Sequence, residues 1–271
     1  MTGSQGSATH PGATTRGTAL VTGASAGIGR ALAREFAANG WDLVVVARRE
    51  ERLQALADDL GESYGSDVDV VPMDLAEHDA ARDLYEEVTD RGITVEALVN
   101  NVGAGVHGPF HETDLERQLD QVQLNVRLPV HLTRLYLPGM VDRDAGIVLN
   151  VSSMAAFQPG PYLAGYYASK AYLLHFSEAI AEELRDTNVS VTALCPGPID
   201  TEFQERAGQE APAGGSYSNT SEGVAEAGYR GAMAGETVVI PSRRMKLTYL
   251  LSRLAPRSLA RRAARRVNAD R

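Results

Sequence analysis

The chain has 271 residues, of which 44% are apolar and 23% charged, a composition that excludes intrinsic disorder for most of its length. Its single cysteine, Cys195, excludes an internal disulfide framework and a zinc site made of several thiolates. A lone thiol suits a reducing compartment, so we expect a cytoplasmic protein with Cys195 as a small apolar strand residue. Residues 1–16 are rich in Gly, Ser and Thr and lack an apolar core, which predicts a flexible arm rather than a signal peptide.

Charge is unevenly distributed along the chain. The net charge is −9, yet residues 243–271 contain ten Lys or Arg and a single acid, Asp270. The acidic remainder argues against nucleic acid as a partner, and no apolar run approaches the roughly 18 residues of a membrane span. We expect the tail, 243–271, to be a basic amphipathic helical extension that packs on the body or on a partner subunit. Contact of its arginines with anionic lipid is the minor alternative.

Residues 17–242 alternate between short apolar runs and helical patterns. The nearly continuous apolar runs are typical of strands buried on both faces. They predict an α/β fold, a doubly wound parallel sheet of Rossmann type, as a single domain with a C-terminal helical extension. The expected strands are Thr18–Thr22, Trp41–Ala47, Val68–Met73, Val95–Asn100, Ile147–Val151, Val189–Cys195 and Val238–Ile240. The expected helices run through Leu32 to Asn39 and over 50–60, 79–90, 113–140 (bent or ended at Pro129 and Pro138) and 167–185, and a lid is expected at about 201–228.

A glycine-rich segment, TGASAGIG at residues 22–29, joins the first expected strand to the first helix. Its spacing is G-x-x-x-G-x-G, with Gly23, Gly27 and Gly29 at the fixed positions. Glycines let the backbone approach a pyrophosphate closely, and a helix N-terminus offers free N–H groups and positive potential. A tight strand-to-helix connection is the plain alternative, but the place near the start of an α/β domain favours a dinucleotide site.

Two arginines, Arg48 and Arg49, follow the second expected strand. An acidic residue about 20 residues beyond the glycine loop would hold the ribose 2′-hydroxyl of NAD, whereas arginine accommodates the 2′-phosphate of NADP. We therefore predict NADP(H) as the cofactor, with Arg48 as the main contact and Arg49 as the second. The alternative is that both arginines form the solvated start of a helix.

Tyr166 and Lys170 are spaced Y-x-x-x-K, which places both side chains on one face of a helix. The neighbouring Tyr167 has no lysine four residues further on, so the spacing singles out Tyr166. Ser153 lies 13 residues before Tyr166, at the end of the fifth expected strand. Strand ends are where ligands of such sheets bind, so Ser153 is expected near a bound ligand.

Together the motifs resemble the short-chain dehydrogenase/reductase family, in its TGxxxGxG and YxxxK branch, over about residues 18–240. The resemblance implies that Ser153, Tyr166, Lys170 and Asn125 are the catalytic residues. It implies that Asn125 bends its helix and holds, through its backbone carbonyl, a water linked to Lys170. The cofactor contacts that it implies, besides Arg48, Arg49, Tyr166 and Lys170, are Gly23, Ser25, Gly27, Ile28 and Gly29 at the diphosphate, Asp74 and Leu75 near the adenine, Asn101 and Gly103 on the nicotinamide side, and Pro196, Gly197, Ile199 and Thr201 after the sixth strand.

Two of these segments have features of their own. Asp74 is equally suited to cap a helix N-terminus. Val102, between Asn101 and Gly103, replaces the alanine usual in the family and would crowd the nicotinamide side slightly.

The residue types suit transfer of hydride to a carbonyl. A tyrosine phenol has an unperturbed pKa of ~10, and a neighbouring ammonium and an oxidised nicotinamide favour its ionised form. By resemblance, Tyr166 is then the acid in reduction and the base in oxidation. Ser153 is a hydrogen-bond donor to the substrate oxygen, and Lys170 lowers the pKa of Tyr166 and holds the nicotinamide ribose.

The sequence therefore predicts an NADP(H)-dependent oxidoreductase acting on a small-molecule carbonyl or secondary alcohol. The alternatives are a reductase of 3-oxoacyl thioesters, which a basic patch at the mouth of the site would favour, and a non-catalytic NADP-binding sensor or scaffold. Resemblance implies a homodimer or homotetramer, of which we expect the dimer. A hydrophobic substrate is expected because most residues placed around it are apolar: Val102, Val106, Met154, Phe157, Tyr162, Phe203 and Tyr217.

A histidine pair, His107 and His111, is the remaining candidate for a metal site. Gly108 and Pro109 lie between them and disfavour a helix, so the two rings are not expected to share a face. We predict no metal.

Overall fold

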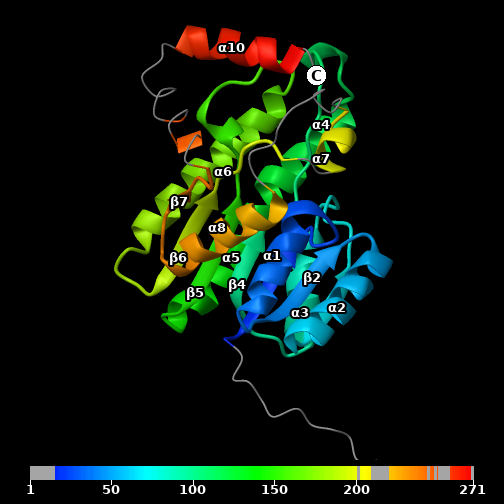
Figure 1. The fold of residues 1–271 in the computed structure, drawn as a ribbon, viewed down its shortest axis with the longest axis vertical. Helices are drawn as coiled ribbons and strands as arrows, with labels where there is room; N and C mark the ends of the chain where they lie inside the picture. The colour runs from blue at the N-terminus through cyan, green and yellow to red at the C-terminus, as the bar shows by residue number, and fades with distance from the viewer. Residues whose placement is uncertain are drawn as a thin grey trace, which may run out of the picture.

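A parallel sheet forms the centre of the molecule (Figure 1). The structure is a computed structural model that describes residues 16–199, 202–208, 220–242, 245–246, 249 and 257–269. The strands lie where the apolar runs predicted them: β1 (Thr18–Thr22), β2 (Asp42–Ala47), β3 (Val68–Pro72), β4 (Val95–Asn100), β5 (Gly146–Val151), β6 (Val189–Leu194) and β7 (Val238–Val239). Their order, β3-β2-β1-β4-β5-β6-β7, with parallel pairing throughout, confirms the predicted Rossmann-type fold.

Helices cover both faces of this sheet. They are α1 (Gly27–Ala38), α2 (Glu50–Tyr64), α3 (Ala80–Asp90), α4 (Leu115–Val122), α5 (Leu128–Asp142), α6 (Ala164–Glu183), α7 (Glu202–Arg206), α8 (Ser221–Met233) and α10 (Arg257–Ala269), with short 3-10 turns at Phe110–Glu112 and Met154–Phe157. α1, α2 and α8 pack on one face, and α3, α5 and α6 pack on the other. Successive strand residues point to opposite faces, so Val21 and Val45 enter the first layer while Leu20 and Val44 enter the second.

The chain reverses its direction of winding next to β1. β1 pairs with β2 on one side and with β4 on the other. Because the first three strands extend the sheet one way and the later strands the other, a crevice is left beyond the carboxyl ends of β1 and β4. The glycine-rich segment follows β1 directly, so the topology places it at this crevice.

The long helix expected over 113–140 is interrupted. Between α4 and α5 the chain forms a π-helical stretch, Gln123–Arg127, in which the N–H of Leu128 bonds to the carbonyl of Gln123 five residues earlier. Pro129 sits in the first turn of α5, where a missing N–H is least costly. Pro138 lies inside α5, which continues past it to Asp142.

The segment expected as a lid at about 201–228 is shorter than predicted. Ser221 begins α8, and the hydroxyl of Thr220 caps this helix by accepting a hydrogen bond from the N–H of Gly223. Val224 and Ala225 are buried in the layer that contains α1, so this part is core rather than lid. The sequence showed little apolar periodicity here because α8 uses small residues to approach its neighbours closely.

The described helices lack the features of membrane-spanning segments. Every helix within the described ranges falls short of the length or the apolar character that crossing a bilayer requires.

Phe36 joins three elements of the first layer. Its fully buried ring lies 5.5 Å from the ring centroid of Trp41 and 5.0 Å from that of Tyr229, edge-on in both cases. We expect Phe36→Ala to lower the free energy of unfolding by about 3–5 kcal/mol, because it removes a buried aromatic side chain and leaves a cavity. Urea unfolding followed by circular dichroism measures this change. Phe110→Ala, at a ring that is 65% exposed, should stay within about 0.5 kcal/mol of the parent. Equal losses in both variants would contradict this assignment of the core.

Candidate active site

A cavity of about 820 Å³ lies beyond the carboxyl ends of the central strands. The segments that follow β1 to β6 contribute to its wall, together with α6 and α7. It brings together nearly all the residues that the sequence singled out: Gly23, Ser25, Gly27, Ile28, Gly29, Arg48, Arg49, Asp74, Leu75, Asn101, Gly103, Ser153, Tyr166, Lys170, Pro196, Gly197 and Ile199. Asn125 lies behind the wall, and Thr201 lies outside the described residues.

The glycine loop has the backbone that its sequence requires. Gly23 and Gly27 have φ values of +69° and +54°, a region that L side chains rarely adopt. A Cβ atom on Gly29 would lie 2.3 Å from both Asn101 Nδ2 and the carbonyl oxygen of Gly23. Gly29 is therefore needed so that α1 can pack against the end of β4. Ala26 precedes α1 and offers no side-chain acceptor, so the N–H groups of the first turn suit an anionic ligand.

Arg48 and Arg49 occupy different surroundings at the cavity rim. The Arg48 side chain is 65% exposed and lies 3.6 Å from a carboxylate oxygen of Asp74. Arg49 is half-buried and donates to the hydroxyl of Ser25 at 3.1 Å and to the carboxylate of Glu202 at 2.9 Å. Both cations thus line the same rim of the cavity.

Asp74 shapes a turn at the same rim. Its carboxylate accepts a hydrogen bond from the N–H of Ala76 at 3.1 Å. α3 begins only at Ala80, so Asp74 stabilises the turn after β3 and does not cap that helix, which was the plain alternative for this residue.

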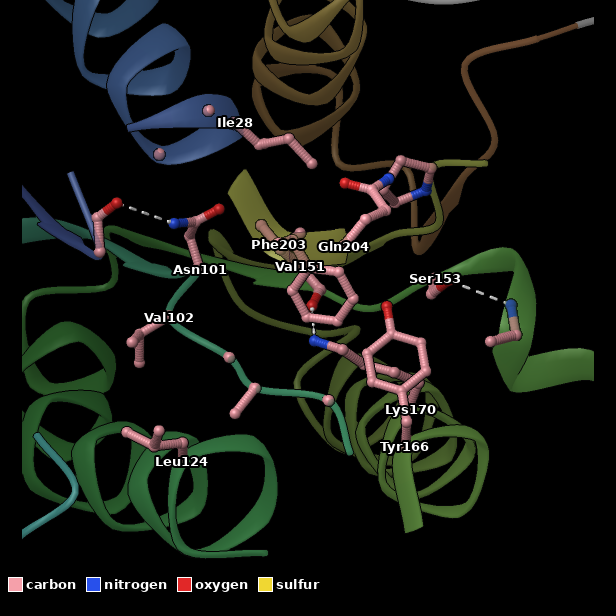
Figure 2. Close-up of a pocket in the computed structure, with 18 of the residues that line it drawn as sticks. Ile28, Asn101, Val102, Leu124, Val151, Ser153, Tyr166, Lys170, Phe203 and Gln204 are labelled. Carbon is pink, nitrogen blue, oxygen red and sulfur yellow. Dashed lines mark hydrogen bonds between the residues drawn. The ribbon is translucent and has the colours of Figure 1, made fainter. Parts of the chain in front are cut away.

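Ser153, Tyr166 and Lys170 converge on one wall of the cavity. Figure 2 shows the Tyr166 hydroxyl directed towards Ser153, with which it shares a hydrogen bond. The Ser153 hydroxyl oxygen accepts from the N–H of Ala155 at 3.1 Å, so the turn after β5 fixes its position. Lys170 Nζ lies 5.8 Å from the centre of the Tyr166 ring and donates to the carbonyl of Val151 at 2.7 Å.

The surroundings of this group change its proton affinities. Burial raises the pKa of the Tyr166 phenol to about 12, and the hydrogen bond with Ser153 partly opposes that rise. Burial lowers the pKa of Lys170, which is 4% exposed, to about 8. Low solvation disfavours the charged form of each group, which accounts for both directions. Tyr166 is therefore set to hold its proton at neutral pH, next to a lysine that is still predominantly charged.

Asn125 supports the wall without lining it. Its side chain is 1% exposed, donates to the carbonyl of Ala104 and the hydroxyl of Ser169, both at 2.9 Å, and accepts from the N–H of Ala104 at 2.8 Å. It lies in the π-helical stretch, as the expected bend required. Pro129, four residues on, has no N–H to offer the Asn125 carbonyl, which suits the proposed binding of a water there.

α7 spans the cavity between the arginines and the tyrosine. The Phe203 ring packs 5.2 Å from the Tyr166 ring, as Figure 2 shows. At the other side of the helix the carboxylate of Glu202 pairs with Arg49 and, at 2.6 Å, with Arg52. α7 is thus the described part of the expected lid that reaches the site.

The predicted substrate-contacting residues divide into three groups. The prediction that Tyr162 contacts the substrate is wrong, because Tyr162 does not line the cavity. Its φ of +66° places it in a tight turn, and its ring centre lies 6.3 Å from that of His107. Tyr217 lies outside the described residues. Those that line the cavity are Val102, Val106, Met154, Phe157 and Phe203.

Sequence reasoning missed several wall residues. Among them are Gln158, Leu163, Tyr167, Met245 and Val267. Tyr167 was set aside because only Tyr166 has a lysine at helical spacing, and Val267 sits in an arginine-rich helix with no motif. These residues come from separate segments of the chain, so spacing within any one segment could not have identified them together.

The two histidines and the cysteine have ordinary surroundings. His107 Nε2 lies 2.8 Å from the carbonyl oxygen of Asn268, and His111 lies 3.2 Å from the carboxylate of Glu112. Cys195 is fully buried beside Ala193, and burial raises the pKa of its thiol to about 12. Its position is that of an apolar residue at the end of a strand.

The fold and this arrangement of side chains define the class of protein, a Rossmann-type nucleotide-binding oxidoreductase. The family model described as short chain dehydrogenase matches residues 17–212, and the chain belongs to that family. It is 39% identical over 188 residues to a short chain dehydrogenase of Pseudocercospora fijiensis, covering 69% of this chain and 60% of the relative. It is 34% identical over 193 residues to the very-long-chain 3-oxoacyl-CoA reductase of Anas platyrhynchos, covering 69% and 61%.

Another relative is named as inactive. The chain is 35% identical over 189 residues to the human inactive hydroxysteroid dehydrogenase-like protein 1, covering 68% of this chain and 56% of the relative. The matches thus span less than two thirds of the length of these three curated relatives.

Solved structures match over more of the chain. A short-chain dehydrogenase of Sphingobium yanoikuyae in complex with NADPH is 29% identical with a TM-score of 0.80, covering 90% of this chain and 94% of that one. A 7beta-hydroxysteroid dehydrogenase is 27% identical with a TM-score of 0.83, covering 92% and 96%.

The buried lysine gives stability an unusual pH dependence. Below pH 8 Lys170 is charged in both the folded and unfolded states, whereas between pH 8 and its unperturbed pKa of 10.5 only the unfolded chain keeps the proton. Stability therefore rises with pH in this window. We expect wild type to gain about 1–2 kcal/mol relative to Lys170→Met between pH 8 and 9.5 in urea unfolding of the cofactor-free protein. Lys246→Met, at an exposed lysine, should follow the wild-type profile. A constant difference between wild type and Lys170→Met across this range would disprove the expected titration.

Proposed function

We propose that this protein is an NADP(H)-dependent oxidoreductase that interconverts a carbonyl and a secondary alcohol on an apolar small molecule. One observation carries the proposal: Ser153, Tyr166 and Lys170 converge on the cavity that also contains the glycine loop. A structural role alone would not require a buried ammonium beside a buried phenol, because burying both groups costs free energy.

The three residues have separate tasks. In reduction, Tyr166 donates its hydroxyl proton to the substrate oxygen as that oxygen gains negative charge. Ser153 donates a second hydrogen bond to the same oxygen and, through Ala155, is held in place to do so. The charge of Lys170 stabilises the phenolate that Tyr166 leaves behind. In oxidation Tyr166 accepts the alcohol proton.

The residues present fit a dinucleotide. The N-terminus of α1 and the Gly23–Gly29 loop would hold the pyrophosphate, and Arg48 and Arg49 would hold an adenosine 2′-phosphate. Lys170 and the segment after β6 would hold the nicotinamide half. When bound, the nicotinamide supplies or accepts the hydride. The complex of the Sphingobium relative with NADPH supports the choice of NADP(H).

The cavity wall supports an apolar substrate. Val102, Val106, Met154, Phe157 and Phe203 lie outside the groups assigned to the cofactor. Apolar walls with a few placed polar groups are typical of sites for hydrophobic small molecules. A structural relative named as a hydroxysteroid dehydrogenase is consistent with this class, without identifying the compound.

A reductase of 3-oxoacyl thioesters is the second candidate. α10 carries five exposed arginines and contributes Val267 to the cavity wall, so a basic surface adjoins the site. Coenzyme A and carrier proteins are anionic, which such a surface would attract. The relative from Anas platyrhynchos bears this activity in its name. A KM for 3-oxoacyl-CoA that rises with salt, while that for a ketone does not, would favour this candidate.

A non-catalytic role is the third reading. The relative named inactive shows that the family contains such proteins. The intact set of Ser153, Tyr166 and Lys170 supports the enzyme instead.

The wider organisation is part of the same proposal. Residues 17–242 act as one catalytic domain and 243–271 as its extension. A homodimer is supported by exposed apolar side chains on neighbouring helices, among them Leu115, Leu119 and Tyr172.

Tyr166→Phe tests the mechanism. The variant keeps the ring that packs against Phe203, so we expect it to fold and bind NADPH, with turnover reduced by at least about 100-fold because the proton donor is lost. NADPH consumption is measured over a panel of ketones, aldehydes, quinones and 3-oxoacyl thioesters. Tyr172→Phe, an exposed tyrosine on the same helix, is the control. Turnover in Tyr166→Phe close to that of wild type would break the mechanism.

Arg48→Asp tests the cofactor preference. Placing a carboxylate at this position should weaken NADPH binding by about 10–100-fold, since a charge-assisted hydrogen bond to the 2′-phosphate is lost. NADH binding should change little, because NADH lacks that phosphate. Fluorescence titration with both cofactors measures the two dissociation constants. Arg185→Asp, an exposed arginine outside the cavity, is the control. Equal losses for NADPH and NADH would remove Arg48 from the phosphate site.

A further inference from the structure

α10 lies across the end of the molecule where the cavity opens, above α6 in Figure 1. Residues at every fourth position form its inner face: Ala260 is half-buried, Ala264 is 3% exposed and Asn268 is fully buried. Small alanines let the helix approach the body closely. Val267, next to Asn268, belongs to the cavity wall and is still 54% exposed. A ligand bound in the cavity would cover this exposed apolar side chain.

Asn268 connects three distant segments. Its Nδ2 donates to the carbonyl of Pro161 at 2.9 Å, and its amide lies 3.4 Å from the hydroxyl of Tyr167. Its backbone carbonyl faces His107 Nε2 at 2.8 Å. A carbonyl oxygen only accepts, so His107 must carry a proton on Nε2. Asn268 therefore ties α10 to the loop after β4 and to the start of α6.

These two loops belong to the substrate half of the cavity. The loop after β4 carries Val106 and the segment before α6 carries Leu163, both in the wall and both outside the groups assigned to the cofactor. The loops are already joined by a hydrogen bond from the N–H of Gly108 to the carbonyl of Tyr162 at 2.9 Å. Asn268 adds α10 to this unit as an outer wall.

We propose that α10 is the outer wall of the substrate site and that Asn268 is the positioning residue that holds it there. The wall selects for substrates with a long apolar part, which extends from the carbonyl beside Tyr166 to Val267. A short ketone occupies the inner part and does not reach α10. This inference rests on the proposed oxidoreductase function for its kinetic consequence, but the attachment of α10 is independent of it.

The rate of trypsin cleavage within α10 measures how firmly this helix is attached to the body. Arg261, Arg262, Arg265 and Arg266 are exposed cleavage sites within α10, and cutting a helix requires its local opening. Losing the buried hydrogen bonds of the Asn268 side chain should raise the cleavage rate of this segment by about 5–10-fold in Asn268→Ala. His107→Ala should act in the same direction, whereas His107→Gln, which can still donate an N–H, should be milder. Leu259→Ala, at a 56% exposed position of the same helix, is the matched control.

The KM for decanone divided by the KM for butanone, both measured with NADPH, tests whether α10 acts as the outer wall. We expect Asn268→Ala and Val267→Ala to raise this ratio by about 5–10-fold, because the long chain loses its outer contact, and Leu259→Ala to leave it unchanged. A purely structural role would lower activity on both ketones alike. Unchanged cleavage in Asn268→Ala would overturn the attachment, and faster cleavage with an unchanged ratio would overturn the wall.

Failure of the proposed function gives a different result. If wild type binds NADPH but turns over neither ketone, slower trypsin cleavage of α10 in the presence of decanone, but not butanone, reports the wall without catalysis. That protection would sustain the inference while the proposed reaction failed. Its absence would overturn the inference as well.

Discussion

The buried hydroxyl of Thr22 joins the two strands at which the sheet changes direction. It donates to the carbonyl of Val99 at 3.2 Å and accepts from the N–H groups of Asn101 and Val102 at 2.9 and 3.1 Å. The Asn101 side chain returns a bond to the Thr22 carbonyl at 2.8 Å. Because this junction fills the space between β1 and β4, only glycine fits at position 29. The crevice therefore has a fixed width, with the glycine loop on one side and the segment after β4 on the other.

A second constraint is the charge of Lys170 inside the wall. An ammonium at this depth loses its hydration, which the carbonyl of Val151 offsets in part. Burial disfavours the charged form of both groups, so it lowers the pKa of Lys170 and raises the pKa of Tyr166. Functional sites are often where such perturbed groups are found together, since the fold keeps them despite their effect on stability.

Two buried asparagines fasten the wall from outside. Asn125 pins the backbone of Ala104 to the π-helical stretch and to α6, and Asn268 pins α10 to two loops. The Asn125 amide pairs with both the N–H and the carbonyl of Ala104, and the Asn268 amide donates to the carbonyl of Pro161. The loops that line this part of the cavity are thus held by side chains that do not themselves line it.

Local sequence determined the sheet, the glycine loop and the grouping of Ser153, Tyr166 and Lys170. Apolar runs specify strands, glycine spacing specifies a strand-to-helix turn, and residues four apart on a helix share a face, all of which act over short distances. The winding of such a sheet then brings strand ends to one edge without further information. Local sequence predicted a bend near Asn125 and Pro129 but not its π-helical form. It also did not predict the early start of α8 or the outward position of Tyr162, because each depends on packing against distant segments.

The placement of the tail shows the same division most clearly. Composition and spacing indicated that α10 is basic, helical and amphipathic, but its inner face consists of small alanines and the polar Asn268. Its contacts with Pro161, Tyr167 and His107 join residues more than 100 positions apart. Only the tertiary structure could decide that a buried asparagine attaches this helix, because hydrogen bonds between a side chain and distant parts of the chain leave no pattern in the sequence.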